Sequence, residues 1–398
     1  MLNYNQIPER SRGMNKKDII TIIVTTLVIA ALIAGCVYLT TRHRSGFHEK
    51  KTFGIINSMY QTDGQNIYFS HEKKLMRFNT ASDELVKLCT DTRCDGGCIL
   101  ENATYTSRLY RNRFYFSFYG DICGFAYYDI KTAKTHIIKK YNEPVYSEFF
   151  VYDGYIYHML YPVHDENHAV YRLSVKSGKD EMIFSLEPDE YLIMAADGMI
   201  FTEKTVIEVI DGNYESPISY STVYAYDANT LERRELWHSD KDKYNRIGSR
   251  VQFFDGKLYF VIRTDGENQF GSLLSYLCCL DADSGVAEYL SQTPIRDFHL
   301  TREGIYLETN ECKEVSTEIG QFCDTMTLMR LERNIRLTDH GGNSIITSYE
   351  NAGIESYSGY FANGKFLGQV KYTGIDQKTE HFVVIDIESG EIKDITLP

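Results

Sequence analysis

Short runs of alternating apolar and polar residues recur along most of this chain, and each is followed by a tight turn and a second run. The turns are Asp-Gly, Glu-Gly or Asn-Gly steps at 63–64, 153–154, 197–198, 255–256, 303–304 and 363–364, with a degenerate Arg-Asn step at 111–112. Period-two alternation is typical of half-buried strands, and glycine lets two strands fold back tightly. The pattern therefore predicts a series of β-hairpins.

Each hairpin belongs to a longer unit that repeats every 42 to 60 residues. In the third unit, strand-length runs lie at 148–153, 155–160, 169–175 and 181–186, which makes four strands. A repeat of this size is typical of β-propeller blades. We therefore expect an all-β fold over residues 53–398, a propeller of seven four-stranded blades, with eight blades as the rival count.

A second kind of turn, rich in Asp, Asn and Ser, is expected between the third and fourth strands of a unit. Examples lie at 175–178, 227–230, 281–285 and 386–390. Side chains of these types bond their own backbone and so stabilise turns. The stretch 281–285 has a passing likeness to a calcium loop, but it lacks the distal glutamate and is interpreted as a turn.

Residues 19–39 contain no charged side chain and are flanked by Lys16-Lys17 and Arg42-His43-Arg44. Twenty-one uncharged and mostly apolar residues are long enough to cross a bilayer. We expect a short cytoplasmic tail (1–18), a transmembrane signal anchor (19–39) and a juxtamembrane linker (40–52). In the alternative interpretation, Ile33-Ala34-Gly35-Cys36 is a lipobox and the protein is a lipoprotein lipidated at Cys36.

Charge is distributed unevenly along the chain. The whole chain has a net charge of −13. Residues 1–44 carry +4, so the remaining residues carry −17. Such an acidic domain would repel phosphate backbones, so nucleic-acid binding is not expected. A short basic tail before a first span favours a single-pass protein of the cell membrane with an extracytoplasmic C-terminal domain.

Three cysteines, Cys89, Cys94 and Cys98, lie within ten residues after the first unit. With Cys123 or a carboxylate as the fourth ligand, this spacing supplies the tetrahedral thiolate set that Zn²⁺ prefers. The same residues fit disulfides in an exported protein, or free thiols. These alternatives stay open, and no other cofactor is expected.

The remaining cysteines and the histidines suggest fewer sites. Cys312 and Cys323 flank an insertion in the sixth unit, where a cross-strand disulfide is predicted. Cys278 and Cys279 lie within one strand and are expected to be small buried hydrophobes. The only dense histidine and carboxylate cluster, interpreted as a solvated hairpin loop and not as a metal site, consists of His158, His164, Asp165, Glu166 and His168.

The repeated phrases Leu75-Met76-Arg77-Phe78-Asn79 and Val170-Tyr171-Arg172-Leu173, together with the Asp-Gly turns, resemble the membrane-anchored TolB-like and DUF5050-type propellers of clostridial bacteria. The likeness covers about residues 53–398. It implies an exported, membrane-tethered propeller without an assigned activity. Family members carry a cysteine-rich loop similar to Leu88–Cys94, but a histidine usually follows the second cysteine, where this chain has Asp95.

The chain contains none of the Gly-x-Ser-x-Gly, His-Glu-x-x-His, Walker or dinucleotide-binding motifs that mark common enzyme classes. We therefore expect a binding or scaffolding module, not an enzyme, with its ligand at the channel mouth or on the loop face. The partner would be a surface protein, a peptide or a glycan. Two alternatives remain: an enzyme acting on cell-wall glycans or peptides at a channel-mouth site, and a transmembrane sensor.

Overall fold

The structure, a computed structural model, describes residues 60–63, 65–71, 74–88, 103–118, 123–142, 148–159, 168–208, 218–240, 245–267, 273–291, 294–295, 297–300, 305–311, 325–331, 343–346, 354–372, 381–386, 389 and 391–395. These residues all belong to the second of two compact units, Thr52–Pro398. In the described part of the chain, no helix is long and apolar enough to cross a membrane. The anchor expected at 19–39 and the lipobox cysteine Cys36 lie outside it.

Within the described residues the regular elements are strands. The first sixteen are β1 (Tyr60–Thr62), β2 (Asn66–His71), β3 (Lys74–Asn79), β4 (Glu84–Lys87), β5 (Ala103–Tyr110), β6 (Arg113–Phe118), β7 (Cys123–Asp129), β8 (Lys134–Tyr141), β9 (Phe149–Tyr152), β10 (Tyr155–Met159), β11 (Ala169–Ser174), β12 (Asp180–Ser185), β13 (Glu190–Ala196), β14 (Met199–Glu208), β15 (Ile218–Asp227) and β16 (Arg233–His238). The others are β17 (Asn245–Phe254), β18 (Lys257–Glu267), β19 (Leu273–Asp281), β20 (Ala287–Tyr289), β21 (Asp297–Leu300), β22 (Ile305–Glu311), β23 (Thr325–Leu331), β24 (Asn343–Ile346), β25 (Ile354–Ala362), β26 (Lys365–Tyr372), β27 (His381–Asp386) and β28 (Ile392–Ile395).

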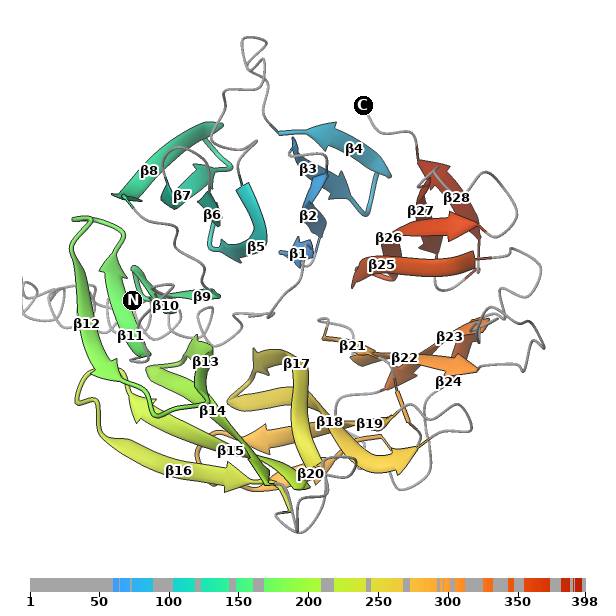
Figure 1. The fold of residues 1–398 in the computed structure, drawn as a ribbon. Coiled ribbons are helices and arrows are strands. Elements are labelled where there is room, and N and C mark those ends of the chain that lie inside the picture. Colours follow the sequence, from blue (N-terminus) through green and yellow to red (C-terminus); the bar gives the residue numbers. More distant parts are fainter. Residues whose placement is uncertain are drawn as a thin grey trace, which may run out of the picture. The chain divides into compact units, whose positions relative to one another are not determined.

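These strands form antiparallel meanders in strict chain order (Figure 1). Five sheets have four strands each, and one eight-stranded sheet combines β13–β16 with β17–β20. The four strands expected at 148–186 are confirmed as β9–β12, each within two residues of its expected bounds. The first strands of successive meanders lie against one another, and β1 of the first meander contacts β25 of the last, which closes the circle. Each of these two meanders is made of four consecutive strands, so neither takes a strand from the other end of the chain.

The tight hairpin turns explain why the Asp-Gly and Asn-Gly steps recur. Glycine was expected to supply the left-handed backbone, but the residue before it is left-handed as well, which is the geometry of a type I′ turn. Asp and Asn tolerate this conformation better than other side chains do. The φ angles are 44° and 79° at Asp153-Gly154, 48° and 79° at Asp197-Gly198, 50° and 75° at Asp255-Gly256, and 49° and 72° at Asn363-Gly364.

The second turn class is confirmed as a set of side-chain caps. The Asp281 carboxylate accepts hydrogen bonds from the N–H groups of Asp283 (3.2 Å) and Ser284 (2.8 Å), and from the Ser284 hydroxyl (2.7 Å). These bonds lower the pKa of Asp281. Asp129, Asp227 and Asp386 cap their own turns in the same way. The stretch 281–285 is therefore a turn, as expected.

Apolar faces pack between neighbouring meanders and form the core. The first and last meanders share one buried cluster, in which the rings of Phe69 and Phe382 stack with centroids 5.5 Å apart. An ion pair between Lys365 and Asp83 joins the same two meanders. Cys278 and Cys279 are buried thiols on opposite faces of β19, as expected, so each belongs to a different inter-sheet cluster.

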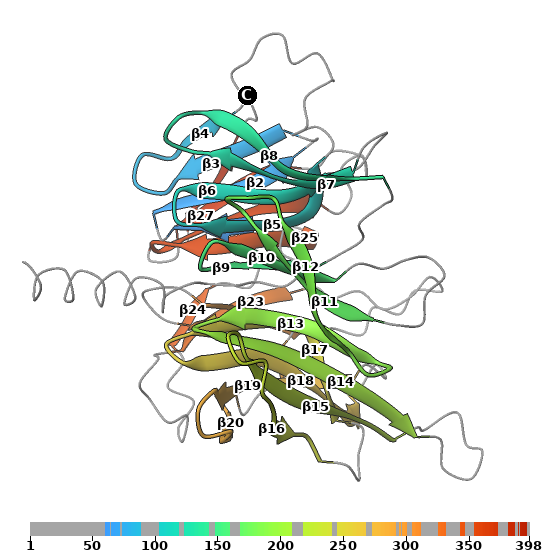
Figure 2. The same cartoon turned by 90° about the vertical axis from the view of Figure 1, so that its left-hand side faces the viewer.

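A long hairpin is formed by β14 and β15, which pair over ten residues each (Figure 2). β14 continues without interruption to Glu208. Tyr220 near the start of β15 forms a parallel bridge to Asn245 of β17, which joins the two meanders into one sheet. This junction positions the site described next.

Candidate functional site

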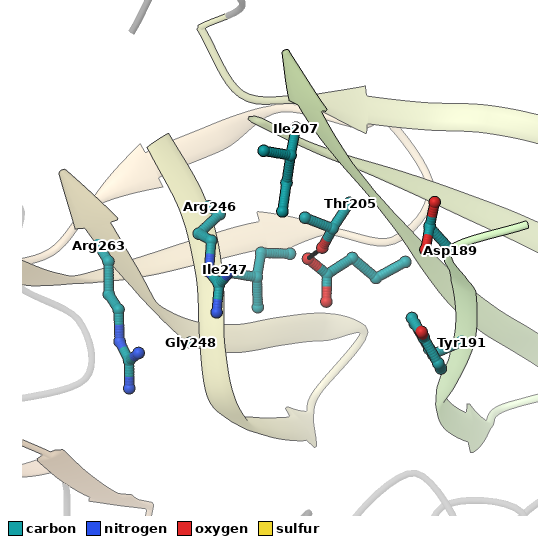
Figure 3. A pocket seen from close by; sticks show the side chains of 9 residues that line it. Asp189, Tyr191, Thr205, Ile207, Arg246, Ile247, Gly248 and Arg263 are labelled. Carbon is teal, nitrogen blue, oxygen red and sulfur yellow. Dashed lines mark hydrogen bonds between the residues drawn. The ribbon is translucent and has the colours of Figure 1, made fainter. Parts of the chain in front are cut away.

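A cleft of about 450 Å³ lies between the β13–β16 and β17–β20 meanders (Figure 3). Its lining residues come from the start of β13, the second half of β14, the start of β17 and β18. Because antiparallel strands alternate in direction, the β13, β14, β17 and β18 positions all lie at the same end of the sheets. We call this space the inter-sheet cleft, because it lies between the two four-stranded halves of the eight-stranded sheet. Four strands converge on it, so its shape is fixed by regular structure.

One wall of the inter-sheet cleft is a face of β14. Glu203, Thr205 and Ile207 lie at every second position, and therefore point to the same side of the strand. Tyr191 of β13 pairs directly with Glu203 and is 39% exposed. This wall thus carries a carboxyl group, a hydroxyl group and a partly exposed aromatic ring.

Glu203 is held at the inner end of this wall by two hydroxyl groups. Ser221 donates a hydrogen bond to Glu203 Oε1 at 2.5 Å, and Thr205 donates to the same oxygen at 3.1 Å. Burial raises the pKa of the Glu203 carboxyl, while those hydroxyl groups and the charge of Arg246 act in the opposite direction. A carboxyl group in a cleft with a raised pKa is a common feature of functional sites.

The floor of the inter-sheet cleft is a hydrogen-bonded network. The Ser221 hydroxyl accepts a hydrogen bond from the N–H of Ile247 at 2.9 Å while it donates to Glu203. The Ser239 hydroxyl accepts from the N–H of Ser221 at 2.9 Å and donates to the carbonyl of Asn245. Both serines are buried. The carboxyl group is therefore preorganised by its own meander, and Ile247 of the next meander orients the Ser221 hydroxyl.

The opposite wall is basic. Arg246 of β17 and Arg263 of β18 are directly opposite each other in the strand register and both line the inter-sheet cleft. Figure 3 shows these two side chains on one side of the cleft, and Asp189 and Tyr191 on the other, with Thr205 between them. The cleft is thus polarised from an acidic wall to a basic wall.

A second groove, of about 590 Å³, lies between the β5–β8 and β9–β12 meanders, next to their tight turns. It is lined by basic and aromatic side chains, but its central arginine is already engaged. Arg113 lies 3.6 Å from the Asp129 carboxylate, and its guanidinium is 4.5 Å from the centre of the Tyr127 ring. This groove is therefore a weaker candidate than the inter-sheet cleft.

Of the site residues expected from the sequence, only Cys123 lies among the described residues. Cys123 is buried at the start of β7, whereas Cys89, Cys94 and Cys98 lie outside the described residues, as do Cys312 and Cys323. Among the described residues, no group of three His, Cys, Asp or Glu side chains could hold a metal ion. The zinc and disulfide hypotheses therefore stay predictions.

His158 corrects one expectation. We expected it in a solvated hairpin loop, but it is a fully buried residue of β10, because the strand continues through it to Met159. Its Nε2 lies 3.1 Å from Asp180, which also accepts a hydrogen bond from the Tyr141 hydroxyl at 2.5 Å. The network links β8, β10 and β12 and is structural. His164, Asp165 and Glu166 lie outside the described residues.

Sequence reasoning missed the residues of the inter-sheet cleft. Their signal was present but weak: Glu203 and Thr205 are polar residues on the same face of β14 that carries Phe201 into the core. Arg246 and Arg263 are separated by a hairpin in the sequence. Only the strand register shows that they are opposite each other.

No protein-family model matches the chain, and no curated protein matches it. Among solved structures, oligogalacturonate lyase from Vibrio parahaemolyticus is similar at 11% identity, with a TM-score of 0.52 over 86% of this chain and 93% of that one. The β-propeller domain of the trilobed protease from Pyrococcus furiosus gives 10% identity and a TM-score of 0.50, over 87% of this chain and 98% of that one. TolB from Acinetobacter baumannii gives 10% identity and a TM-score of 0.40, over 72% of this chain and 61% of that one.

The first two likenesses, together with the closed circle of meanders, identify the fold as an all-β propeller. This confirms the all-β propeller expected from the repeat, while the number of blades stays a prediction. At about 10% identity these structures show the fold alone, because propellers carry many unrelated functions. The likeness to TolB is too weak to add to the argument.

Proposed function

We propose that this protein is an exported, membrane-anchored propeller of seven blades that acts as a binding module, with its ligand in the inter-sheet cleft. The proposal joins the apolar segment at 19–39, which predicts the anchor, to a domain whose meanders match the repeat. In this proposal the fourth blade is β13–β16 and the fifth is β17–β20.

The observation that supports a binding role is the polarised cleft itself. Small-molecule sites are concave, mostly preformed, and contain a few convergent polar groups, with volumes of about 300–1,000 Å³. The inter-sheet cleft has a volume within that range, a partly exposed Tyr191, and charged groups of both signs held by strands. Preformed groups favour binding because less conformational entropy is lost when the ligand arrives.

An enzyme acting on cell-wall peptides or glycans is the second candidate, and one observation favours it. The raised pKa of Glu203 makes this carboxyl group a candidate general acid. If the protein were such an enzyme, Glu203→Gln would abolish turnover while the variant still bound its substrate. For a binding module, no turnover is expected from either protein.

The test uses the full-length protein in detergent, with a panel of short peptides and oligosaccharides. We expect at least one ligand to slow amide hydrogen exchange in β14 and β17, and Arg263→Met to remove that protection. Arg113→Met, in the second groove, is the matched control and should leave the protection unchanged. Protection confined to other strands, for every ligand that binds, would refute the inter-sheet cleft as the binding site.

A further inference from the structure

The two arginines of the basic wall lie side by side, and the charge of Arg246 also acts on the Glu203 carboxyl. Arg246 and Arg263 are direct cross-strand neighbours in β17 and β18, so both side chains project from the same face of the sheet. Like charges at such positions destabilise a sheet. Arg263 makes no hydrogen bond or ion pair with any residue that the structure describes. A bound anion would offset the repulsion and give Arg263 a partner.

Arg113 of the second groove provides a comparison, because its charge has a partner within the protein. Arg113 of β6 is also directly opposite a charged residue, but that residue is Asp129, and the two form an ion pair. The β17–β18 ladder places a second arginine where the β6–β7 ladder has an aspartate. The difference suggests that the partner of Arg263 comes from a ligand.

The acidic wall carries the complementary charge. Asp189 is exposed in the turn directly before β13, and its backbone is in the left-handed region with a φ of 61°. The N–H of Thr205 donates a hydrogen bond to the Asp189 carbonyl at 3.1 Å, which fixes this residue against β14. This places the Asp189 side chain at the end of the cleft opposite the arginines, as Figure 3 shows.

From this polarity we infer that the inter-sheet cleft binds a dipolar ligand, a free amino acid or a short peptide with both termini uncapped. The inference rests on the proposed binding function. Arg246 and Arg263 hold the carboxylate end, because guanidinium groups match carboxylates in charge and hydrogen-bond geometry. Asp189 faces the ammonium end, and Glu203, Thr205 and Tyr191 contact the segment between them.

The test compares four probes by calorimetry on the full-length protein in detergent: triglycine, N-acetyltriglycine, triglycinamide and N-acetyltriglycinamide. Glycine is added to distinguish a free amino acid from a peptide. We expect triglycine to bind more tightly than either singly capped form by about tenfold or more, the effect of losing one charged hydrogen-bonded end. Binding of glycine at least as tight as triglycine would indicate an amino-acid site.

Two variants assign the ends of the ligand. Arg263→Met should remove the preference for triglycine over triglycinamide, and Asp189→Asn the preference over N-acetyltriglycine. Arg113→Met should change neither. The inference is overturned if triglycine binds no more tightly than its capped forms, or if the variants leave both preferences intact.

The same set of probes separates failure of the inference from failure of the proposed function. If N-acetyltriglycinamide protects β14 and β17 as well as triglycine does, the binding function stands and the dipolar ligand is wrong. If no probe and no member of the broader peptide and oligosaccharide panel protects these strands, both are wrong.

Discussion

Replacing Ser221 with alanine tests whether the floor of the inter-sheet cleft is held by the network described above. Ser221 is fully buried and its hydroxyl both accepts from the N–H of Ile247 and donates to Glu203. Ser221→Ala would leave a buried N–H without its acceptor and a carboxyl group without its closest donor. Leaving one buried polar group unsatisfied costs about 1–3 kcal/mol, and the lost hydrogen bond about 1 kcal/mol more. We therefore expect a loss of about 2–4 kcal/mol in unfolding free energy.

Ser219 provides a matched control two residues away on the same strand. It is also buried, but its hydroxyl has no hydrogen-bond partner within the described structure. Ser219→Ala removes an unsatisfied polar group, so we expect its stability to remain within about 1 kcal/mol of the wild type.

The assay is equilibrium urea unfolding of the full-length protein in detergent, followed by the fluorescence of Trp237. This is the only tryptophan of the chain, and the centre of its ring lies 5.7 Å from the centre of the Phe260 ring of β18. Its fluorescence therefore reports on the junction between the two meanders. Equal midpoints for the two variants would refute the claim that Ser221 holds the floor, because both substitutions remove the same atoms.

Three further predictions follow from other parts of the molecule. Burial raises the pKa of Glu203 above its value in the unfolded chain, so the folded state binds more protons, and stability falls as pH rises between the two pKa values. Glu203→Gln should therefore flatten this part of a profile of urea midpoint against pH. A profile unchanged by the substitution would contradict the prediction. Phe382→Ala should lower the unfolding free energy by about 3–5 kcal/mol in the same assay, because the buried ring packs against Phe69 where the first and last meanders meet. A decrease below about 1 kcal/mol would argue against this contact between the two meanders. Intact-mass analysis without reductant, combined with peptide mapping, should find Cys312 and Cys323 joined and two hydrogens lighter, whereas free thiols at both would disprove the disulfide.

Much of the fold could be predicted because propeller repeats are local in sequence. Each meander places its four strands in chain order, and its turns are specified by short steps such as Asp153-Gly154 or by a capping residue such as Asp281. The period of the repeat then predicts the ring, since a four-stranded sheet with two apolar faces must stack against neighbours. No long-range information was needed for these inferences.

His158 shows where local reasoning was wrong. Its neighbours in the sequence suggested a polar loop, yet the strand extends through it, and its partner Asp180 comes from two strands further along. A histidine buried with a carboxylate has no short-range signature, because the group that makes burial tolerable is distant in the sequence.

The sequence by itself determined the local elements of this protein: the strands, the left-handed turns, the capped hairpins and the repeat that joins them into a propeller. Only the tertiary structure decided the inter-sheet cleft. Glu203 and Ser221 meet through the pairing of β14 with β15, Arg246 and Arg263 through the register of β17 with β18, and the two walls through a parallel bridge between meanders. Register and inter-sheet packing depend on all the contacts made at once, so no single stretch of residues encodes them.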